Sequence, residues 1–143
     1  MSMKLHCKTN TLVRALSVAA LSAALVACAS VPQTPESIVQ KRSQEYWQAR
    51  IAAKPEVAYR FATPAYRALR SVDQYRAQFG PGAAVESAET IDVKCPSAER
   101  CTTLVRLQVR PLVPGRDFHA IATHREEVWL NEQGQWWLYQ NMQ

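Results

Sequence analysis

The order of hydrophobic and polar residues changes from a helical to a strand-like pattern near the middle of the chain. Before Gly80 apolar residues recur three and four positions apart, and after Gly82 they alternate with polar residues. The segment Thr34-Pro35-Glu36 combines a capping residue, a proline and an early acid, so it predicts a helix that runs to about Ala53. The apolar side of this helix consists of Val39, Tyr46, Trp47 and Ile51. This pattern is typical of an amphipathic helix that covers a sheet.

Three shorter helices are predicted next. Pro55 starts a helix that runs through Phe61, and Thr63-Pro64 starts another. Ser71 and Gln74 have the spacing of a capping box and start the third. Four arginines of these helices are interpreted as solvated side chains or partners of backbone carbonyls, namely Arg60, Arg67, Arg70 and Arg76.

Two strands joined by a short loop are predicted after Gly82. Apolar and polar residues alternate from Val85 to Cys95 and again from Cys101 to Val109. If the two cysteines face each other, the further partners are Ile91 with Val105, Val93 with Thr103, and Glu86 with Arg110. One register therefore aligns the cysteines, apolar residues and a charge pair, as expected of a disulfide-capped hairpin.

A second hairpin is predicted at the C-terminal end. Pro111 and Pro114-Gly115 separate it from the first, and its strands run from about Asp117 to Leu130 and from Gln135 to Gln140. The turn Asn131–Gly134 has a glycine where a positive φ is favoured. Pairing across this turn gives Trp129 with Trp136 and Glu127 with Leu138. The whole pattern predicts an α+β domain, with a long N-terminal helix and short helices packed on a four-stranded antiparallel sheet.

The N-terminal segment has the features of an export signal. Lys4, Lys8 and Arg14 provide a positive start, and a weakly apolar run of 13 residues extends from Ala15 to Ala27. A membrane-spanning helix needs about 20 apolar residues, so this run is interpreted as a removable signal peptide.

The end of this run, Leu25-Val26-Ala27-Cys28, resembles the lipobox of bacterial lipoproteins. The resemblance implies cleavage before Cys28, which then carries a diacylglycerol and an N-acyl chain such as palmitate and anchors the chain to a membrane. Ala29 stands where an aspartate favours inner-membrane retention in Gram-negative relatives, so outer-membrane attachment with a periplasmic domain is expected. The alternative is an ordinary secretory signal with an incidental cysteine. The expected organisation is a signal peptide at 1–27, a tether at 28–33 and an α+β domain at 34–143.

Length and charge narrow the class of protein. The chain has 143 residues, which fits one domain after removal of the signal peptide. Its formal charge of +5 falls to +2 in the mature part, because three of the 17 basic residues leave with the signal and all 12 acidic residues stay. The mature part has no basic run, so no nucleic-acid partner is expected.

The number of cysteines supports the predicted disulfide. Cys7 lies in the signal peptide and Cys28 carries the lipid, which leaves Cys95 and Cys101 as a pair. In an oxidising compartment such a pair is disulfide-bonded by default. The alternative is that the two cysteines bind a zinc ion, but no histidine lies near either cysteine in the sequence. We therefore expect neither a metal site nor a cofactor.

Three segments of the predicted domain carry a family resemblance: Glu45-Tyr46-Trp47, Thr63-Pro64-Ala65-Tyr66-Arg67, and the hairpin from Glu127 to Leu138. They are similar to the nuclear-transport-factor-like superfamily, the cystatin-like α+β roll shared with ketosteroid isomerase and scytalone dehydratase. The resemblance spans about Pro35 to Gln140. It implies a curved sheet wrapped around the first helix, with a conical pocket between them. Enzymes, ligand binders and assembly modules all use this fold.

The resemblance also assigns the two faces of the sheet. Trp136 and Leu138 match residues that face the pocket in the family, and the candidate pocket residues on this assignment are Tyr46, Trp47, Arg125, Glu127, Trp129 and Trp136. The opposite face carries an apolar strip made of Val128, Leu130, Trp137 and Tyr139. Many relatives dimerise through that face, so the strip is a candidate interface for a homodimer or an envelope protein partner.

Catalysis is not expected from this sequence. An enzyme of this fold needs an acid, a histidine or a tyrosine in an apolar pocket. His119 and His124 are an odd number of positions apart on a predicted strand, so they point to opposite faces, and His124 shares the outer face with Glu126. The expected function is a lipid-anchored, non-catalytic binding or assembly module of the envelope. The alternatives are a carrier of a small apolar ligand in the conical pocket and an isomerase-like or dehydratase-like enzyme.

Overall fold

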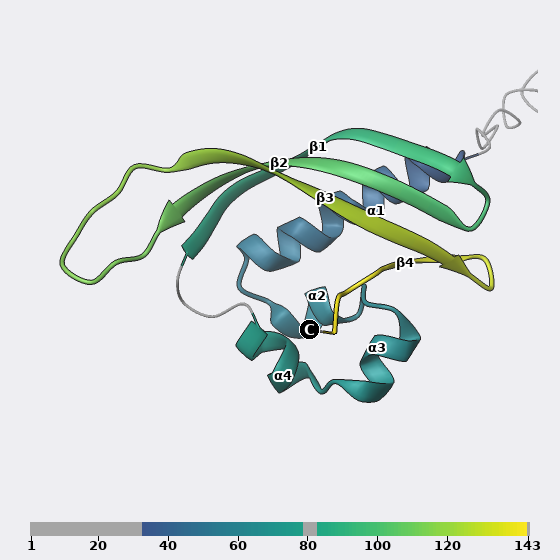
Figure 1. Ribbon diagram of the computed structural model, residues 1–143, viewed down its shortest axis with the longest axis horizontal. Coiled ribbons are helices and arrows are strands. Elements are labelled where there is room, and N and C mark those ends of the chain that lie inside the picture. Colours follow the sequence, from purple (N-terminus) through teal and green to yellow (C-terminus); the bar gives the residue numbers. More distant parts are fainter. Residues whose placement is uncertain (1–32, 79–82, 143) are drawn as a thin grey trace, which may run out of the picture. The chain divides into compact units, whose positions relative to one another are not determined.

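The structure is a computed structural model that describes residues 33–78 and 83–142 (Figure 1). Its elements are α1 (Pro35–Ile51), α2 (Pro55–Tyr59), α3 (Pro64–Leu69), α4 (Val72–Gln78), β1 (Ala83–Ser97), β2 (Arg100–Pro111), β3 (Ile121–Glu132) and β4 (Gln135–Leu138). The strands form one antiparallel sheet in the order β1-β2-β3-β4 with helices packed on it, which confirms the predicted α+β class. The predicted signal peptide, the lipidation site Cys28 and the tether up to Pro32 lie outside the described residues.

The helices begin at the predicted capping residues. The Thr34 side chain accepts a hydrogen bond from a backbone N–H in the first turn of α1, and Thr63 does the same for α3. Ser71 and Gln74 cap α4 reciprocally, each side chain accepting from the backbone N–H of the other residue. α1 ends slightly before the predicted position, where Ala53 takes a positive φ of 52° and the chain turns toward α2.

α1 lies along one face of the sheet, and α2 to α4 gather near the C-terminal residues (Figure 1). The buried residues of α1 are Val39, Ser43, Tyr46, Trp47 and Ala49. The strands β1, β2 and β3 extend past the C-terminal end of this helix (Figure 1). Ile51, which was predicted on the apolar side of the helix, is 40% exposed because it lies at this end.

The β1–β2 hairpin contains the expected disulfide. Cys95 and Cys101 are bonded to each other next to the turn, with their Cα atoms 4.0 Å apart. Val93 is paired with Thr103, as the sequence predicts. The alternation of residue types therefore gives the correct register close to the turn.

Farther from the turn the predicted register is wrong, because β1 contains bulges. An irregularity directly after Thr90 makes this residue, rather than Ile91, the partner of Val105. Ile91 is consequently 41% exposed. A second irregularity removes Glu86 from direct pairing with Arg110, although the two side chains still form an ion pair. An extra residue in a strand leaves no mark in a pattern of period two, so the pattern could not locate it.

The β3–β4 turn is tighter than predicted. Its two central residues, Gln133 and Gly134, have φ angles of 55° and 81°, as a two-residue hairpin turn requires. The predicted pairs Trp129–Trp136 and Glu127–Leu138 are wrong, and the structure pairs Trp129 with Leu138. The register differs by two residues, so each side chain keeps its face of the sheet.

Candidate functional site

The space between α1 and the sheet, where the sequence predicts a pocket, is filled by the protein's own side chains. Five of the six candidate pocket residues are almost completely buried: Trp129 (0% exposed), Tyr46 (1%), Trp136 (2%), Trp47 (3%) and Glu127 (5%). Tyr46 and Trp47 meet edge to face with ring centroids 5.3 Å apart, and Phe61 packs in the same way on Tyr46 and Trp129. If an open pocket lay beside the rings of Tyr46, Trp47 and Trp129, part of their surface would be accessible to solvent, and almost none of it is. A ligand therefore reaches this point only if the core rearranges.

Glu127 lies in a cluster of hydroxyl groups under α1. Ser43 of α1 and Thr103 of β2 each donate a hydrogen bond of 3.2 Å to Oε2 of Glu127. Thr90 of β1 donates to Oγ of Ser43 over 2.9 Å. Oε1 of Glu127 and Nε1 of Trp47 are buried without a hydrogen bond of standard geometry among the described residues. The cluster thus joins α1, β2 and β3 through the carboxyl group of Glu127, and it reaches β1 through the hydroxyl of Ser43.

Burial raises the pKa of the Glu127 carboxyl above its usual value. The charge of Arg125, the hydrogen bonds from Ser43 and Thr103, and the nearby indole N–H of Trp47 lower this pKa, but by less than burial raises it. A shifted pKa is typical of acids that act in catalysis. Such an acid must also reach its substrate. Glu127 is sealed inside the core and does not meet this second condition.

The other residues considered for chemistry do not join Glu127. Arg125, the sixth candidate pocket residue, shares the inner face of the sheet with its buried β2 partner Val105, but its side chain is exposed. His124 is exposed on the opposite face. His119 lies in the connection between β2 and β3, not in a strand as predicted. The described residues therefore place no histidine beside the buried acid.

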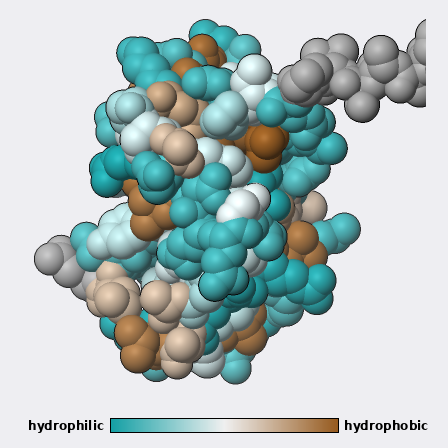
Figure 2. Space-filling model, turned by 90° about the vertical axis from the view of Figure 1, so that its right-hand side faces the viewer, coloured by the Kyte–Doolittle hydropathy of each residue, from teal (hydrophilic) through white to brown (hydrophobic). Residues whose placement is uncertain are grey.

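The candidate interface strip is covered in part. Its members are Val128, Leu130 and Trp137, which are half-buried, and Tyr139, which is 52% exposed. The guanidinium groups of Arg42 and Arg67 lie 5.8 Å and 4.8 Å from the ring centroid of Trp137. The strip is therefore only partly open to solvent in the single chain. The side of the molecule that carries the β1–β2 and β3–β4 turns is mostly hydrophilic, with apolar groups at several places, the widest of them at the lower left of the view (Figure 2).

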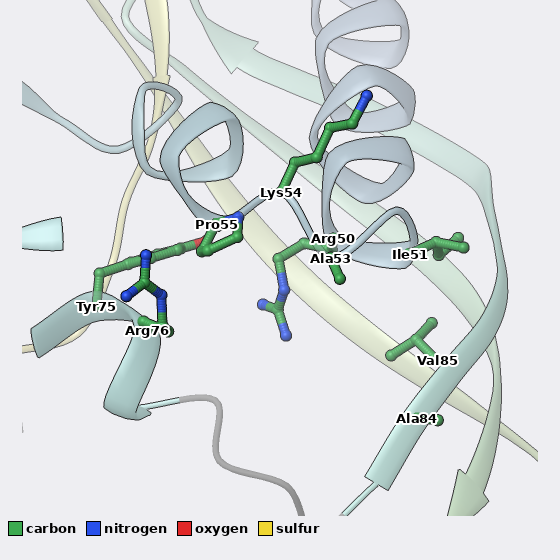
Figure 3. Close-up of a pocket in the computed structure, with 9 residues that line it drawn as sticks. All are labelled: Arg50, Ile51, Ala53, Lys54, Pro55, Tyr75, Arg76, Ala84 and Val85. Atoms are coloured by element: carbon green, nitrogen blue, oxygen red, sulfur yellow. The ribbon is translucent and has the colours of Figure 1, made fainter. Parts of the chain in front are cut away.

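A hollow of about 420 Å³ lies at the C-terminal end of α1, between this helix, α4 and the start of β1 (Figure 3). Its apolar lining consists of Ile51, Ala53, Pro55, Ala84 and Val85. Its polar lining consists of Arg50, Lys54, Tyr75 and Arg76. Apolar walls with a few polar groups, in a volume of about 300–1,000 Å³, are typical of small-molecule sites. We name this feature the α1-end hollow.

The guanidinium group of Arg50 points into the α1-end hollow, between Arg76 and Val85 (Figure 3). The side chain is half-buried, and its Nη1 donates a hydrogen bond of 3.1 Å to the hydroxyl of Tyr46. Its guanidinium also lies 5.9 Å and 5.6 Å from the ring centroids of Tyr46 and Trp47. These aromatic contacts hold the positive charge at the edge of the hollow.

The other polar groups of the hollow are arranged differently. The ammonium group of Lys54 points away from it (Figure 3). Arg76 forms ion pairs with Glu56 and with Asp73, the latter at 3.0 Å. Burial raises the pKa of the Tyr75 hydroxyl, which keeps this group neutral. Arg50 therefore directs its guanidinium into the hollow, whereas the charged end of Lys54 points away from it.

The sequence patterns do not predict this site. They predict that Arg76 is a solvated side chain or a partner of a backbone carbonyl, and they predict no role for Arg50 or Lys54. One signal was available, since Arg50 is a basic residue in the last turn of a helix. A basic residue there is already explained by the helix dipole, so it does not point to a ligand.

The described residues contain no group of three or more His, Cys, Asp or Glu side chains that could hold a metal ion. Within the same ranges, no helix combines the length and the apolar character needed to cross a membrane.

The sequence matches no protein-family model, and no curated protein matches it significantly. The structure is similar to the solution structure of a SEC-C motif containing protein from Rhodopseudomonas palustris. This match has a TM-score of 0.54 and 15% sequence identity, and it covers 75% of this chain and 76% of that one. A SEC-C motif containing protein from Psychrobacter arcticus is similar with a TM-score of 0.53 and 14% identity, over 77% of this chain and 60% of that one. At these identities the likeness concerns the fold alone, and the resemblance to the nuclear-transport-factor-like superfamily stays a prediction.

Proposed function

We propose that this chain is an envelope lipoprotein, anchored to the outer membrane through Cys28, whose α+β domain binds a ligand without converting it. The observation that carries the binding role is the α1-end hollow, which joins an apolar wall to the charge of Arg50. Sites of this composition bind small molecules and orient them through one or two polar groups.

The envelope location has support from two separate parts of the chain. The segment Leu25–Cys28 and the short apolar run before it support a lipid anchor. The bond between Cys95 and Cys101 supports export independently, because structural disulfides persist in oxidising compartments such as the periplasm.

Binding is favoured over catalysis by the chemistry of the hollow. No carboxylate, thiol or imidazole is among the described residues that line it. Tyr75 lines it too, but burial raises the pKa of its hydroxyl, so this group stays protonated and does not act as a base. The acid with the raised pKa, Glu127, is 5% exposed and has no access to a substrate. An isomerase-like or dehydratase-like reaction needs such a group in contact with its substrate.

We also propose that the α+β domain is a nuclear-transport-factor-like roll. A first helix of 17 residues packed on one face of an antiparallel sheet supports it. A carrier function in the cone itself is disfavoured, because Tyr46, Trp47, Trp129 and Trp136 are each at most 3% exposed. A homodimer through the apolar strip is also disfavoured, because the guanidinium groups of Arg42 and Arg67 lie over the ring of Trp137.

Substitution of Cys28 tests the proposed anchor. Cys28→Ser removes the sulfur that would receive the diacylglycerol, so the chain should lose labelling by radioactive palmitate and leave the outer-membrane fraction. Cys7→Ser is the matched control, since it removes a cysteine from the predicted signal peptide and should change neither result. Recovery of Cys28→Ser in the outer membrane with its label intact would overturn the anchor.

A further inference from the structure

We infer that the α1-end hollow binds an anionic amphiphile, with a carboxylate or phosphate head at Arg50 and a short apolar chain on the inner face of the sheet. This inference rests on the proposed binding role and names the class of ligand. It follows from three features of the described residues: the charge that faces the hollow, the apolar row beside it, and its volume.

The charge favours an anionic head group. A guanidinium is planar and can donate two parallel hydrogen bonds to a carboxylate or a phosphate. The contacts with Tyr46 and Trp47 fix the position of Arg50, so little conformational entropy is lost when a ligand binds. Arg76 contributes less, because Glu56 and Asp73 already compensate its charge.

An apolar row leads away from this charge across the sheet. Val85 lines the hollow and is paired with Val109, which in turn is paired with Ile121. Residues directly opposite each other on neighbouring strands share a face, so the three side chains form one continuous row. Ile121 is 57% exposed, and Ile51, which also lines the hollow, is 40% exposed. An acyl chain lying on this row would remove these groups from water.

The volume limits the size of the ligand that the hollow itself can hold. A hollow of about 420 Å³ corresponds to roughly 14 water molecules at about 30 Å³ each. An eight-carbon carboxylate is smaller than this volume and fits inside it, whereas a membrane phospholipid is several times larger than the carboxylate and does not fit. The ligand class is therefore a short-chain acid or a comparable phosphate monoester.

Photoaffinity labelling of the intact chain, as isolated from cells, tests this inference. The probe is an octanoate that carries a photoreactive diazirine on its chain, and its attachment sites are located by mass spectrometry. Labelling should fall on the peptides that contain Val85, Val109 or Ile121. Unlabelled octanoate should compete at least about tenfold more strongly than octanol, octylammonium or acetate, because only octanoate has both the charge and the chain.

Variants separate the head group from the chain. Arg50→Gln should reduce labelling at least about tenfold, and Arg50→Lys should fall between Gln and the original residue, since lysine keeps the charge but not the planar fork. Val85→Thr keeps the shape of the wall but adds a hydroxyl, so it should weaken labelling as well. Arg100→Gln is the control, because it removes one charge at an exposed position at the other end of β2. Thermal unfolding and the intact disulfide show that each variant is folded.

Three results would overturn the inference. Equal labelling of folded Arg50→Gln and Arg100→Gln would remove the role of Arg50. Competition by octanol as strong as that by octanoate would show that the site has no preference for anions. The inference would then be wrong, but the proposed binding role would remain. Absence of specific labelling would remove both the ligand and the binding role at this hollow. The anchor through Cys28 is tested separately by fractionation, and none of these results affects it.

Discussion

Replacement of the buried Glu127 by glutamine should change the stability of the protein in a pH-dependent way. Relative to the original chain, the variant should gain unfolding free energy as the pH rises from acid to neutral. The carboxyl is 5% exposed, and burial raises its pKa from an ordinary value near 4.5. Ionisation of this group in the folded protein is therefore unfavourable. Glutamine keeps an oxygen that accepts from Ser43 and Thr103, but it never ionises.

The direction of the pH effect follows from proton linkage. Between the ordinary pKa and the raised pKa, the folded chain holds a proton on Glu127 that the unfolded chain has lost. The contribution of this group to stability is therefore fully present below about pH 4.5 and is lost as the pH rises through the folded pKa. One proton gives a slope of at most about 1.4 kcal/mol per pH unit in that window.

Urea unfolding at a series of pH values from about 3.5 to 8 measures this effect. The difference in unfolding free energy between Glu127→Gln and the original chain cancels the titration of all other groups that the two share. This free-energy difference should be constant at the acid end of the series. As the pH rises, the variant should become more stable relative to the original chain. Glu126→Gln is the control, because Glu126 is exposed on the opposite face of the same strand. A difference that does not change with pH for Glu127→Gln would refute the reasoning.

Three smaller effects can be measured by the same unfolding assay. Joint replacement of Cys95 and Cys101 by serine should cost about 2–3 kcal/mol, because the disulfide closes a short loop, and a cost near zero would contradict that value. Gly134→Ala should cost about 1–2 kcal/mol through its φ of 81° alone, since no atom lies within 4 Å of an added Cβ; no loss would mean that the turn adapts. Thr34→Ala should cost about 1 kcal/mol by removing the cap of α1, and unchanged stability would show that water replaces the cap.

Local signals in the sequence were sufficient for the elements of this fold. Thr34, Thr63 and Ser71 start helices because each side chain satisfies a backbone N–H that has no partner within the helix. The cysteine pair fixed the register beside the first turn, where Val93 meets Thr103. The register failed at Ile91, since a bulge changes which residues pair without changing their order in the sequence.

The filled core could be predicted only in part. The face assignment placed Trp129, Glu127 and Trp136 between the helix and the sheet, and they are buried there. Whether such a space is open or filled depends on the combined volume of side chains from several elements. Here Phe61, which lies in the connection between α2 and α3, packs against Tyr46 and Trp129 and helps to close the space. No spacing within a single helix or strand contains that information.

The errors in predicted burial help to locate the candidate site. Ile51 belongs to the apolar side of α1 and should be covered, yet it is 40% exposed, and Ile121 on the inner face of the sheet is 57% exposed. Ile91 is exposed for a different reason, the bulge in β1. Ile51 lines the α1-end hollow, and Ile121 is connected to it through the row of paired residues Val85, Val109 and Ile121. Exposed apolar groups on an inner face cost free energy in the free protein, and sequence rules are most often broken at functional sites. The same two isoleucines should therefore lose solvent exposure when octanoate binds, which differential labelling of their side chains with carbenes would measure, and unchanged labelling would place the ligand elsewhere.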